Sequence, residues 1–322
     1  MPTADRFRRF AEREVRGTSS CYEEWALGVA ADPEVLDLLD ALPEPKRQPN
    51  LVFAAARHAG ISAGPYPGFR AALLANWAAV REIVLARRTQ TNEPGRCAIL
   101  LPLLAALPQP LALLEVGASA GLCLYPDRYA YRYDDRPVLG DSAVVLDCAT
   151  TGPVPFPERL PEIVWRAGID LDPLDVNSAD DVRWLETLIW PEHDHRRARL
   201  AAALDVVRAD PPRIVAGDLN AHVAALAAEA PEGATLVIFH SAVLVYLSPG
   251  ERAAFVDGVQ ALRAIWIANE GPGVLPGISG QDTTMFVLTM DGVPVAHAAG
   301  HGHSLRWLTH GTGRTPTGSP PP

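Results

Sequence analysis

Hydrophobic residues recur with helical spacing through the first third of the chain, and no alternating strand pattern appears there. Clusters of Pro and Gly, as at residues 64–68, separate the helical segments. Asp32 before Pro33 is typical of a helix N-cap followed by proline in the first turn. We therefore expect a helical N-terminal module over residues 1–108 that packs on or caps the rest of the chain. Its predicted helices span residues 5–15, 22–29, 34–42, 51–59, 69–88 and 97–107.

From Pro110 onward, apolar runs of the β type alternate with helical segments. This alternation favours a mostly parallel sheet with helices on both faces, so the predicted fold class is α/β with a Rossmann-like sheet over residues 109–310. Near the end, Asp291-Gly292 lies between two β-type runs and predicts an antiparallel hairpin. The predicted strands are 111–116, 162–171, 213–219, 234–241, 264–270 and 285–292.

Two segments do not fit a minimal α/β unit. Residues 125–161 contain short β-type runs followed by closely spaced prolines, and we expect this insertion to form part of a lid or substrate wall. Residues 311–322 are rich in Pro, Gly, Ser and Thr, which predicts a disordered tail.

Composition limits the possible function. Of the 322 residues, 48% are hydrophobic, enough to bury a core. The net charge of −10 argues against a general binder of nucleic acid or of acidic membranes, which needs a basic face. The four cysteines form no C-x-x-C pair, and neither a signal peptide nor a membrane-spanning run is visible. We therefore expect a cytoplasmic protein with reduced thiols, without nucleic-acid or membrane partners, and with unknown oligomeric state.

The most informative stretch is 111–122, LALLEVGASAGL, in which an apolar run ends at Glu115 and a small-residue turn comes next. Gly117 and Gly121 allow close approach of the backbone, as in the adenosine-ligand sites of α/β proteins. The same letters satisfy G-x-S-x-G, the nucleophile elbow of α/β-hydrolases, with Ser119 as nucleophile. The hydrolase interpretation needs an acid and a histidine later in the chain. The candidates are Asp170 or Asp218 with His240, His297, His301 or His303.

The hydrolase interpretation is the less favoured of the two. The elbow should follow several strands, whereas the first 108 residues have a helical pattern. No HGG-type oxyanion segment precedes the turn, and the elbow does not require Glu115.

The E-x-G-x-S-x-G pattern resembles the first motif of class I S-adenosylmethionine-dependent methyltransferases. Later strand ends follow the order of that family: Asp170, then Asp218, then His240-Ser241 with Tyr246 behind it. The resemblance implies S-adenosylmethionine as cofactor. It implies that Glu115, Gly117, Ser119 and Gly121 hold the methionine end, that Asp170 binds the ribose and Asp218 lies beside the adenine, and that His240 is the candidate base.

Each of these residues also has an ordinary structural interpretation. Asp170 can begin a turn before Pro173, Asp218 can be the N-cap of the following helix, and His240 can be a core histidine with satisfied hydrogen bonds. No metal site is expected, because His193-Asp194-His195 lies at a predicted helix start where a solvated loop is the simpler interpretation.

Further polar residues are candidates for the substrate side of the site. The segment 89–96, TQTNEPGR, carries more polar groups than a helix cap needs, although a simple helix start remains the alternative. No N/D-P-P-Y/F pattern ends the fourth strand, which weakens a nucleic-acid or glutamine target and leaves a small molecule. The substrate-side candidates are Asn92, Glu93, Arg96, Arg128, Tyr129, Ser241 and Tyr246.

Several longer blocks resemble a family of uncharacterised bacterial, largely actinobacterial, proteins that share a domain of unknown function. Cys123 stands where many members have Asn. The sequence thus predicts an S-adenosylmethionine-dependent methyltransferase acting on a small molecule, with a non-catalytic binding or regulatory protein on the same fold as the alternative. The blocks are QTNEPGRCAILLP, LLEVGASAGLCLYPDRYAYRY, RAGIDLDPLDV, RWLETLIWPE and FHSAVLVYL.

Overall fold

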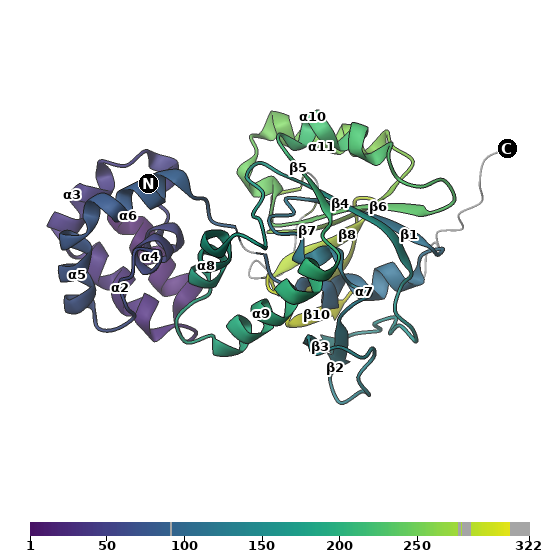
Figure 1. Cartoon of the computed structure of the whole chain (residues 1–322), viewed down its shortest axis with the longest axis horizontal. Helices are drawn as coiled ribbons and strands as arrows, with labels where there is room; N and C mark the ends of the chain where they lie inside the picture. The colour runs from purple at the N-terminus through teal and green to yellow at the C-terminus, as the bar shows by residue number, and fades with distance from the viewer. Residues whose placement is uncertain (91, 276–277, 279–284, 310–322) are drawn as a thin grey trace. The chain divides into compact units, whose positions relative to one another are not determined.

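The computed structural model describes residues 1–90, 92–275, 278 and 285–309, so the predicted tail lies outside the described residues. The chain divides into two compact units (Figure 1). One contains Met1–Asn92 and Leu174–Arg208, and the other contains Glu93–Pro173 and Ala209–Pro322. This division differs from the predicted boundary at residue 108, because the last predicted helix of the N-terminal module belongs with the sheet.

The first unit is helical, as predicted for the N-terminal region. Ser19 and Asp32 cap two of its helices by accepting hydrogen bonds from backbone N–H groups. Its core is aromatic, with the rings of Trp25 and Phe69 stacked 3.9 Å apart. The helices are α1 (Thr3–Phe10), α2 (Ser20–Ala30), α3 (Pro33–Asp40), α4 (Pro49–His58), α5 (Tyr66–Ala75), α6 (Trp77–Ala86), α8 (Ala179–Leu188) and α9 (Asp194–Ala209), with short turns η1 (Ala11–Val15) and η2 (Glu44–Lys46).

Hydrogen bonds from α4 explain why residues 174–208 belong to this unit. Arg57 donates to the carbonyl of Thr187 at 3.0 Å, and His58 contacts Asp180 at 2.9 Å. The indole of Trp184 donates to the carbonyl of Arg88 at 3.2 Å. These contacts join residues more than 90 positions apart, which periodicity along the sequence does not predict.

The second unit is built on one sheet of the order β2-β3-β10-β9-β8-β7-β6-β1-β4-β5. The strands β5, β4, β1, β6 and β7 are parallel, and β8 and β9 form the predicted antiparallel hairpin. Asp291 and Gly292 both have positive φ in its turn, as a two-residue hairpin requires. The strands are β1 (Leu111–Val116), β2 (Ala130–Tyr133), β3 (Val145–Thr151), β4 (Ile163–Asp170), β5 (Arg213–Ala216), β6 (Thr235–Ser241), β7 (Ile265–Glu270), β8 (Phe286–Met290), β9 (Val293–Ala298) and β10 (Ser304–Trp307).

The mostly parallel α/β sheet with its C-terminal hairpin is therefore confirmed. The insertion at 125–161, predicted to form part of a lid or substrate wall, contributes two strands to the sheet. Its strands β2 and β3 pair with each other and, through β3, with β10, so they extend the edge of the sheet. The physical reason is that β10 offers an open edge that β3 pairs with in parallel, from about 150 residues away in sequence.

Helices cover the two faces of the sheet (Figure 1). The helices α10 (Leu219–Ala227) and α11 (Pro249–Gln260) lie along one face, and α7 (Arg96–Ala106) lies on the opposite face. The core beneath α10 and α11 includes Leu114, Ile238, Phe255 and Trp266. Leu114, Ile238 and Trp266 belong to strands, and successive side chains of a strand alternate between faces. The residues directly before and after each of these three therefore face α7.

The turn after β1 lies where the doubly wound sheet changes direction, because β1 has β4 on one side and β6 on the other. Gly117, Ser119 and Gly121 all have positive φ. A Cβ on Gly117 would lie 2.4 Å from a methyl of Val243. The space beside this glycine is therefore filled by a side chain of the protein. A short 3-10 turn, η3 (Leu122–Leu124), comes next in place of a long helix.

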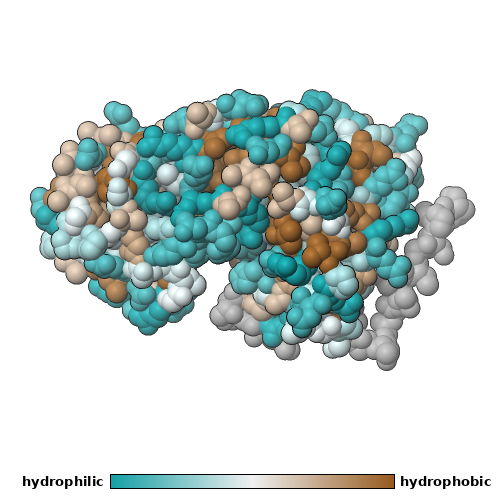
Figure 2. All heavy atoms as spheres, turned by 60° about the horizontal axis from the view of Figure 1, so that its bottom comes forward, coloured by the Kyte–Doolittle hydropathy of each residue, from teal (hydrophilic) through white to brown (hydrophobic). Residues whose placement is uncertain are grey.

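Both units mix polar and apolar surface. Figure 2 shows hydrophilic side chains interspersed with small hydrophobic areas over the face in view. Among the described residues no helix combines the length and hydrophobicity needed to cross a bilayer.

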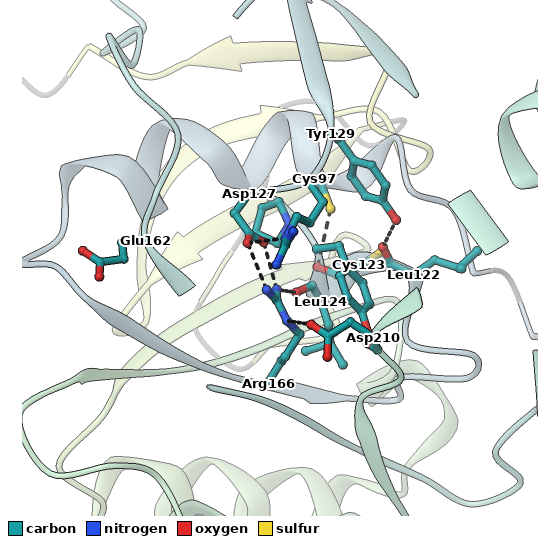
Figure 3. Close-up of polar contacts among 12 residues, drawn as sticks. Cys97, Leu122, Cys123, Leu124, Asp127, Tyr129, Glu162, Arg166 and Asp210 are labelled. Atoms are coloured by element: carbon teal, nitrogen blue, oxygen red, sulfur yellow. Dashed lines mark hydrogen bonds and ion pairs between the residues drawn. The ribbon is translucent and has the colours of Figure 1, made fainter. Parts of the chain in front are cut away.

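Figure 3 shows how the segment after the glycine turn is fastened to β4. The guanidinium of Arg166 donates to both carboxylate oxygens of Asp127, at 2.8 and 2.9 Å. It also donates to the carbonyl of Leu124 at 2.8 Å and lies 4.7 Å over the ring of Tyr125. Such a bidentate pair fixes geometry, so the turn after β1 is anchored on its C-terminal side.

We predict that Gly117→Ala destabilises the protein more than Gly273→Ala does. Both glycines have φ of +74°, but no described residue lies within 4 Å of a Cβ built on Gly273. Gly273→Ala should cost about 1–2 kcal/mol from the left-handed backbone alone. Gly117→Ala should cost about 1–3 kcal/mol more, because Val243 must move. Urea unfolding of both variants measures the difference, and equal losses would show that Val243 does not pack on this turn.

Candidate functional site

Polar side chains gather on the α7 face at the carboxyl ends of the parallel strands. We call this set the edge cluster. Asp170 and Ser241 are the last residues of β4 and β6, and Glu115 and Asn269 are the last residues but one of β1 and β7. Alternation places them on one face, and parallel pairing brings their strand ends to one edge. The edge cluster consists of Glu93, Arg96, Glu115, Ser119, Asp170, Ser241 and Asn269.

Glu115 is a deeply buried acid of this set. It is 5% exposed, and its Oε2 atom has no hydrogen-bond partner among the described residues. Burial raises the pKa of its carboxyl well above the ordinary value of 4.5, and neighbouring Cys123 and Asp170 raise it further while Arg96 opposes the shift. Glu115 is therefore held in its protonated form over a wider pH range than an exposed glutamate.

The serine of the turn lies against Asp170. The backbone N–H of Ser119 donates to Asp170 Oδ2 at 2.8 Å, and the N–H of Asp172 donates to Oδ1 at 2.9 Å. The hydroxyl of Ser119 is buried and has no hydrogen-bond partner among the described residues. The structure thus brings together Glu115, Ser119 and Asp170, which the sequence motif placed in one site.

Arg96 begins α7 and spans from the cluster to the C-terminal strands. It donates to the carbonyl of Ser241 at 3.2 Å and to the carbonyl of Gly300 at 3.0 Å. Glu93 accepts the N–H of Gly95 at 3.1 Å. A Cβ on Gly302 would lie 2.0 Å from the carbonyl oxygen of Gly95, so the two turns pack backbone to backbone. Glu93 and Arg96 therefore hold this turn and also belong to the edge cluster.

Asn269 was missed by the sequence reasoning. Its side chain is fully buried, and its Nδ2 donates to Ser241 Oγ at 2.7 Å. Its Oδ1 has no hydrogen-bond partner in the described part of the chain. The sequence contained one indication of this residue, because the apolar strand ends in two adjacent polar residues, Asn269 and Glu270. Since side chains alternate, these two residues must face opposite sides of the sheet.

His240, the predicted base, faces the other side of the sheet. It is fully buried, with its ring 5.4 Å from that of Phe255 in α11. Trp266 Nε1 donates to His240 Nε2 at 3.0 Å, and since an indole nitrogen can only donate, the proton of the ring is on Nδ1. That proton is donated to Glu270 at 2.7 Å. Both nitrogens are used inside the core, so this geometry gives His240 a structural role.

Glu270 anchors the segment that follows β6. Its Oε1 accepts the N–H groups of Val243 at 2.9 Å and Leu244 at 3.1 Å, as well as His240. This holds Val243 against Gly117 at the point where doubly wound sheets bind nucleotides. The other oxygen, Oε2, is buried without a partner in the described chain.

Several predicted residues have other contacts in the structure. Asp218 is exposed and caps α10 by accepting the N–H of Ala221 at 3.1 Å. Arg128 pairs with Asp127, and Tyr129 is fully buried with its hydroxyl donating to the carbonyl of Leu122 at 2.7 Å (Figure 3). The structure does not bring these residues into the edge cluster. Tyr246 is 65% exposed in the short turn η4 (Leu244–Tyr246), and Asn92 belongs to the helical unit.

The described residues do not assemble a serine-hydrolase triad. No histidine is hydrogen-bonded to Ser119 Oγ, and His240 lies on the other face of the sheet. His297 is buried on β9, while His301 and His303 lie in or beside the turn that follows it. Within the described ranges, His, Cys, Asp and Glu side chains also form no group of three suited to a metal ion.

These features define a doubly wound α/β protein with a buried polar cluster at the carboxyl edge of its sheet. The chain belongs to the family described as "Uncharacterized protein conserved in bacteria (DUF2332)", whose model matches residues 4–307. The resemblance to an uncharacterised bacterial family is thereby confirmed. Searches against curated proteins and against solved structures found no match.

We predict that Glu270→Gln lowers the free energy of unfolding by roughly 2 kcal/mol. The uncharged amide weakens three hydrogen bonds to one buried carboxylate oxygen and adds an unpaired donor. Denaturant unfolding measures this loss. The exposed Glu162→Gln, on the amino side of β4, is the control and should change stability by less than about 0.5 kcal/mol.

We predict that Glu115→Gln removes a pH dependence from the stability of the protein. The folded pKa of Glu115 is raised, so above pH 4.5 the native state retains a proton that the unfolded chain has lost. The free energy of unfolding of the wild-type protein should therefore fall as pH rises above 4.5, and Glu115→Gln should not show this fall. Unfolding of both proteins across the pH range tests this. An identical pH dependence would contradict the assignment.

Proposed function

We propose that the chain binds S-adenosylmethionine at the α7 side of the carboxyl edge and transfers its methyl group to a small molecule. The observation that carries the proposal is the grouping of Glu115, Ser119 and Asp170 at the ends of β1 and β4. Two of these side chains, Glu115 and Ser119, have buried oxygen atoms without hydrogen-bond partners among the described residues. Buried polar groups in native proteins are nearly always paired, so these atoms favour an external partner.

The residues present fit this cofactor in their chemistry. Glu115 Oε2 and Ser119 Oγ can accept hydrogen bonds from an ammonium group, and a carboxylate such as Asp170 is suited to ribose hydroxyls. The glycines contribute differently from the expectation. The Cβ directions of Gly117 and Gly121 are filled by Val243 and Pro212, so the cofactor would contact the α7 side of the turn.

The contribution of the protein to the reaction is position and exclusion of water. S-adenosylmethionine supplies the electrophilic methyl group when it is bound. Methyl transfer is an in-line displacement, and its main source of acceleration is holding the two reactants close together and correctly oriented. Burial of Glu115, Ser119 and Asn269 keeps the site dry. His240 transfers no proton in this geometry, because both of its nitrogens are bonded in the core.

Isothermal titration calorimetry with S-adenosylmethionine and S-adenosylhomocysteine tests the proposal. Glu115→Gln should weaken both about tenfold, the effect of one lost hydrogen bond to a charged group. Wild-type affinity should rise with pH, because Glu115 must ionise to pair with the ammonium, and Glu115→Gln should lose this dependence. Glu162→Gln is the matched control. Its side chain is exposed, and Figure 3 shows it directed away from the labelled contacts.

Failure of the wild-type protein to bind either compound would refute the proposal. Binding of both without methyl transfer to any compound of a broad acceptor panel would favour the alternative, a non-catalytic binding or regulatory protein on the same fold.

A further inference from the structure

We propose that Asn269 and Ser241 form a recognition subsite for a hydrogen-bond donor of the small-molecule substrate, so that the site takes amines or alcohols and rejects carboxylates and phosphates. This inference rests on the proposed function and names the substrate class for the same site. It is carried by Asn269, whose fully buried carbonyl oxygen has no hydrogen-bond partner among the described residues.

The amide of Asn269 is held in one orientation. Asn269 and Ser241 are partners in the parallel pairing of β7 with β6, and Asn269 Nδ2 donates to Ser241 Oγ at 2.7 Å. The backbone carbonyl of Asn269 also accepts the N–H of Ala242 at 3.0 Å. Because the amide nitrogen is held by Ser241, the carbonyl oxygen Oδ1 is the atom of this side chain that can bind a ligand.

The unpartnered atoms of the edge cluster can all accept hydrogen bonds. They are Glu115 Oε2, Ser119 Oγ and Asn269 Oδ1. Arg96, the cation of the cluster, donates to the carbonyls of Ser241 and Gly300. Ser119 Oγ and a protonated Glu115 can also donate, whereas Asn269 Oδ1 can only accept, so a ligand that engages Asn269 Oδ1 must donate a hydrogen bond.

The charges of the cluster disfavour an anion. Arg96 is one cation beside the acids Glu93 and Asp170, and Glu115 adds a further negative charge only when it ionises, because burial raises its pKa. Bringing a carboxylate or phosphate among buried carboxyl groups costs desolvation and adds like-charge repulsion. A neutral hydroxyl avoids the repulsion, and an ammonium is attracted.

The proposed cofactor and substrate sites lie at different strands of the sheet. Glu115 and Asp170 lie at the carboxyl ends of the neighbouring strands β1 and β4, where the cofactor is proposed to bind, whereas Ser241 and Asn269 lie at those of β6 and β7. Arg96 lies between the two pairs: its charge acts on Glu115, and it donates to the carbonyl of Ser241. Cofactor and substrate would thus lie on either side of one fixed guanidinium.

The test uses three probes that share a phenyl ring and differ in the polar group: benzylamine, benzyl alcohol and benzoate. Ligand-observed saturation-transfer NMR on the full chain, at millimolar probe concentration, reports their binding. We expect benzylamine and benzyl alcohol to bind and benzoate not to bind. Preferential binding of benzoate, or binding of none of the three, would overturn the inference.

The variant Asn269→Leu keeps the bulk of the side chain and removes the carbonyl. It should weaken benzylamine and benzyl alcohol at least tenfold while S-adenosylhomocysteine binding changes less than about twofold, since a lost hydrogen bond in a water-excluded site has about this effect. Asn220→Leu, a half-buried asparagine on α10, is the control and should change neither. Unchanged probe binding in Asn269→Leu would contradict the subsite.

A second variant covers the case in which Asn269→Leu does not fold. Asn269→Asp adds a carboxylate at the same place and should strengthen benzylamine relative to benzyl alcohol, and the reverse order would contradict the inference. The outcomes separate the two proposals. Probe binding that depends on Asn269 without S-adenosylhomocysteine binding refutes only the proposed cofactor, whereas cofactor binding without probe binding refutes only the subsite.

Discussion

The alternation of side chains across the parallel sheet is the constraint on which the site depends. At the carboxyl edge, β6 ends in His240-Ser241 and β7 ends in Asn269-Glu270. Alternation sends His240 and Glu270 toward α11, and sends Ser241 and Asn269 toward α7. His240 and Glu270 therefore join a buried structural network, and Ser241 and Asn269 become part of the edge cluster. Two residues that are adjacent in the sequence can thus have different roles, a structural role on one face of the sheet and the proposed binding role on the other.

The two carboxylic acids near the carboxyl ends of β1 and β7, Glu115 and Glu270, illustrate this separation. Glu270 accepts three hydrogen bonds on one oxygen and fixes the segment that places Val243 on Gly117. Each of the two acids also has one buried oxygen without a partner in the described chain, and burial raises the pKa of Glu115. A buried acid that holds backbone donors stabilises the fold, whereas a buried acid without them is costly unless a ligand engages it.

Much of the fold and part of the site could be predicted from the sequence. Periodicity identified the helical first third and the α/β sheet, and Asp291-Gly292 identified the hairpin. The methyltransferase resemblance placed Ser119 and Asp170 in one site, and the N–H of Ser119 does donate to Asp170, while the role of that site stays a prediction. The rest depended on pairing between distant segments. Periodicity does not reveal that residues 174–208 join the helical unit or that β3 pairs with β10. His240 was misassigned because the face of a strand residue is set by register, which the local sequence leaves open by one position.

A crystal structure of the protein with S-adenosylhomocysteine tests the central claim most directly, namely that the α7 face of the carboxyl edge binds ligand and the α11 face is structural. We predict ligand density against Glu115 and Ser119, with the bonds of His240 to Glu270 and Trp266 unchanged. Ligand density against His240 would contradict this claim, as would a structure in which Glu115 Oε2 and Asn269 Oδ1 are bonded only to water in the presence of saturating ligand.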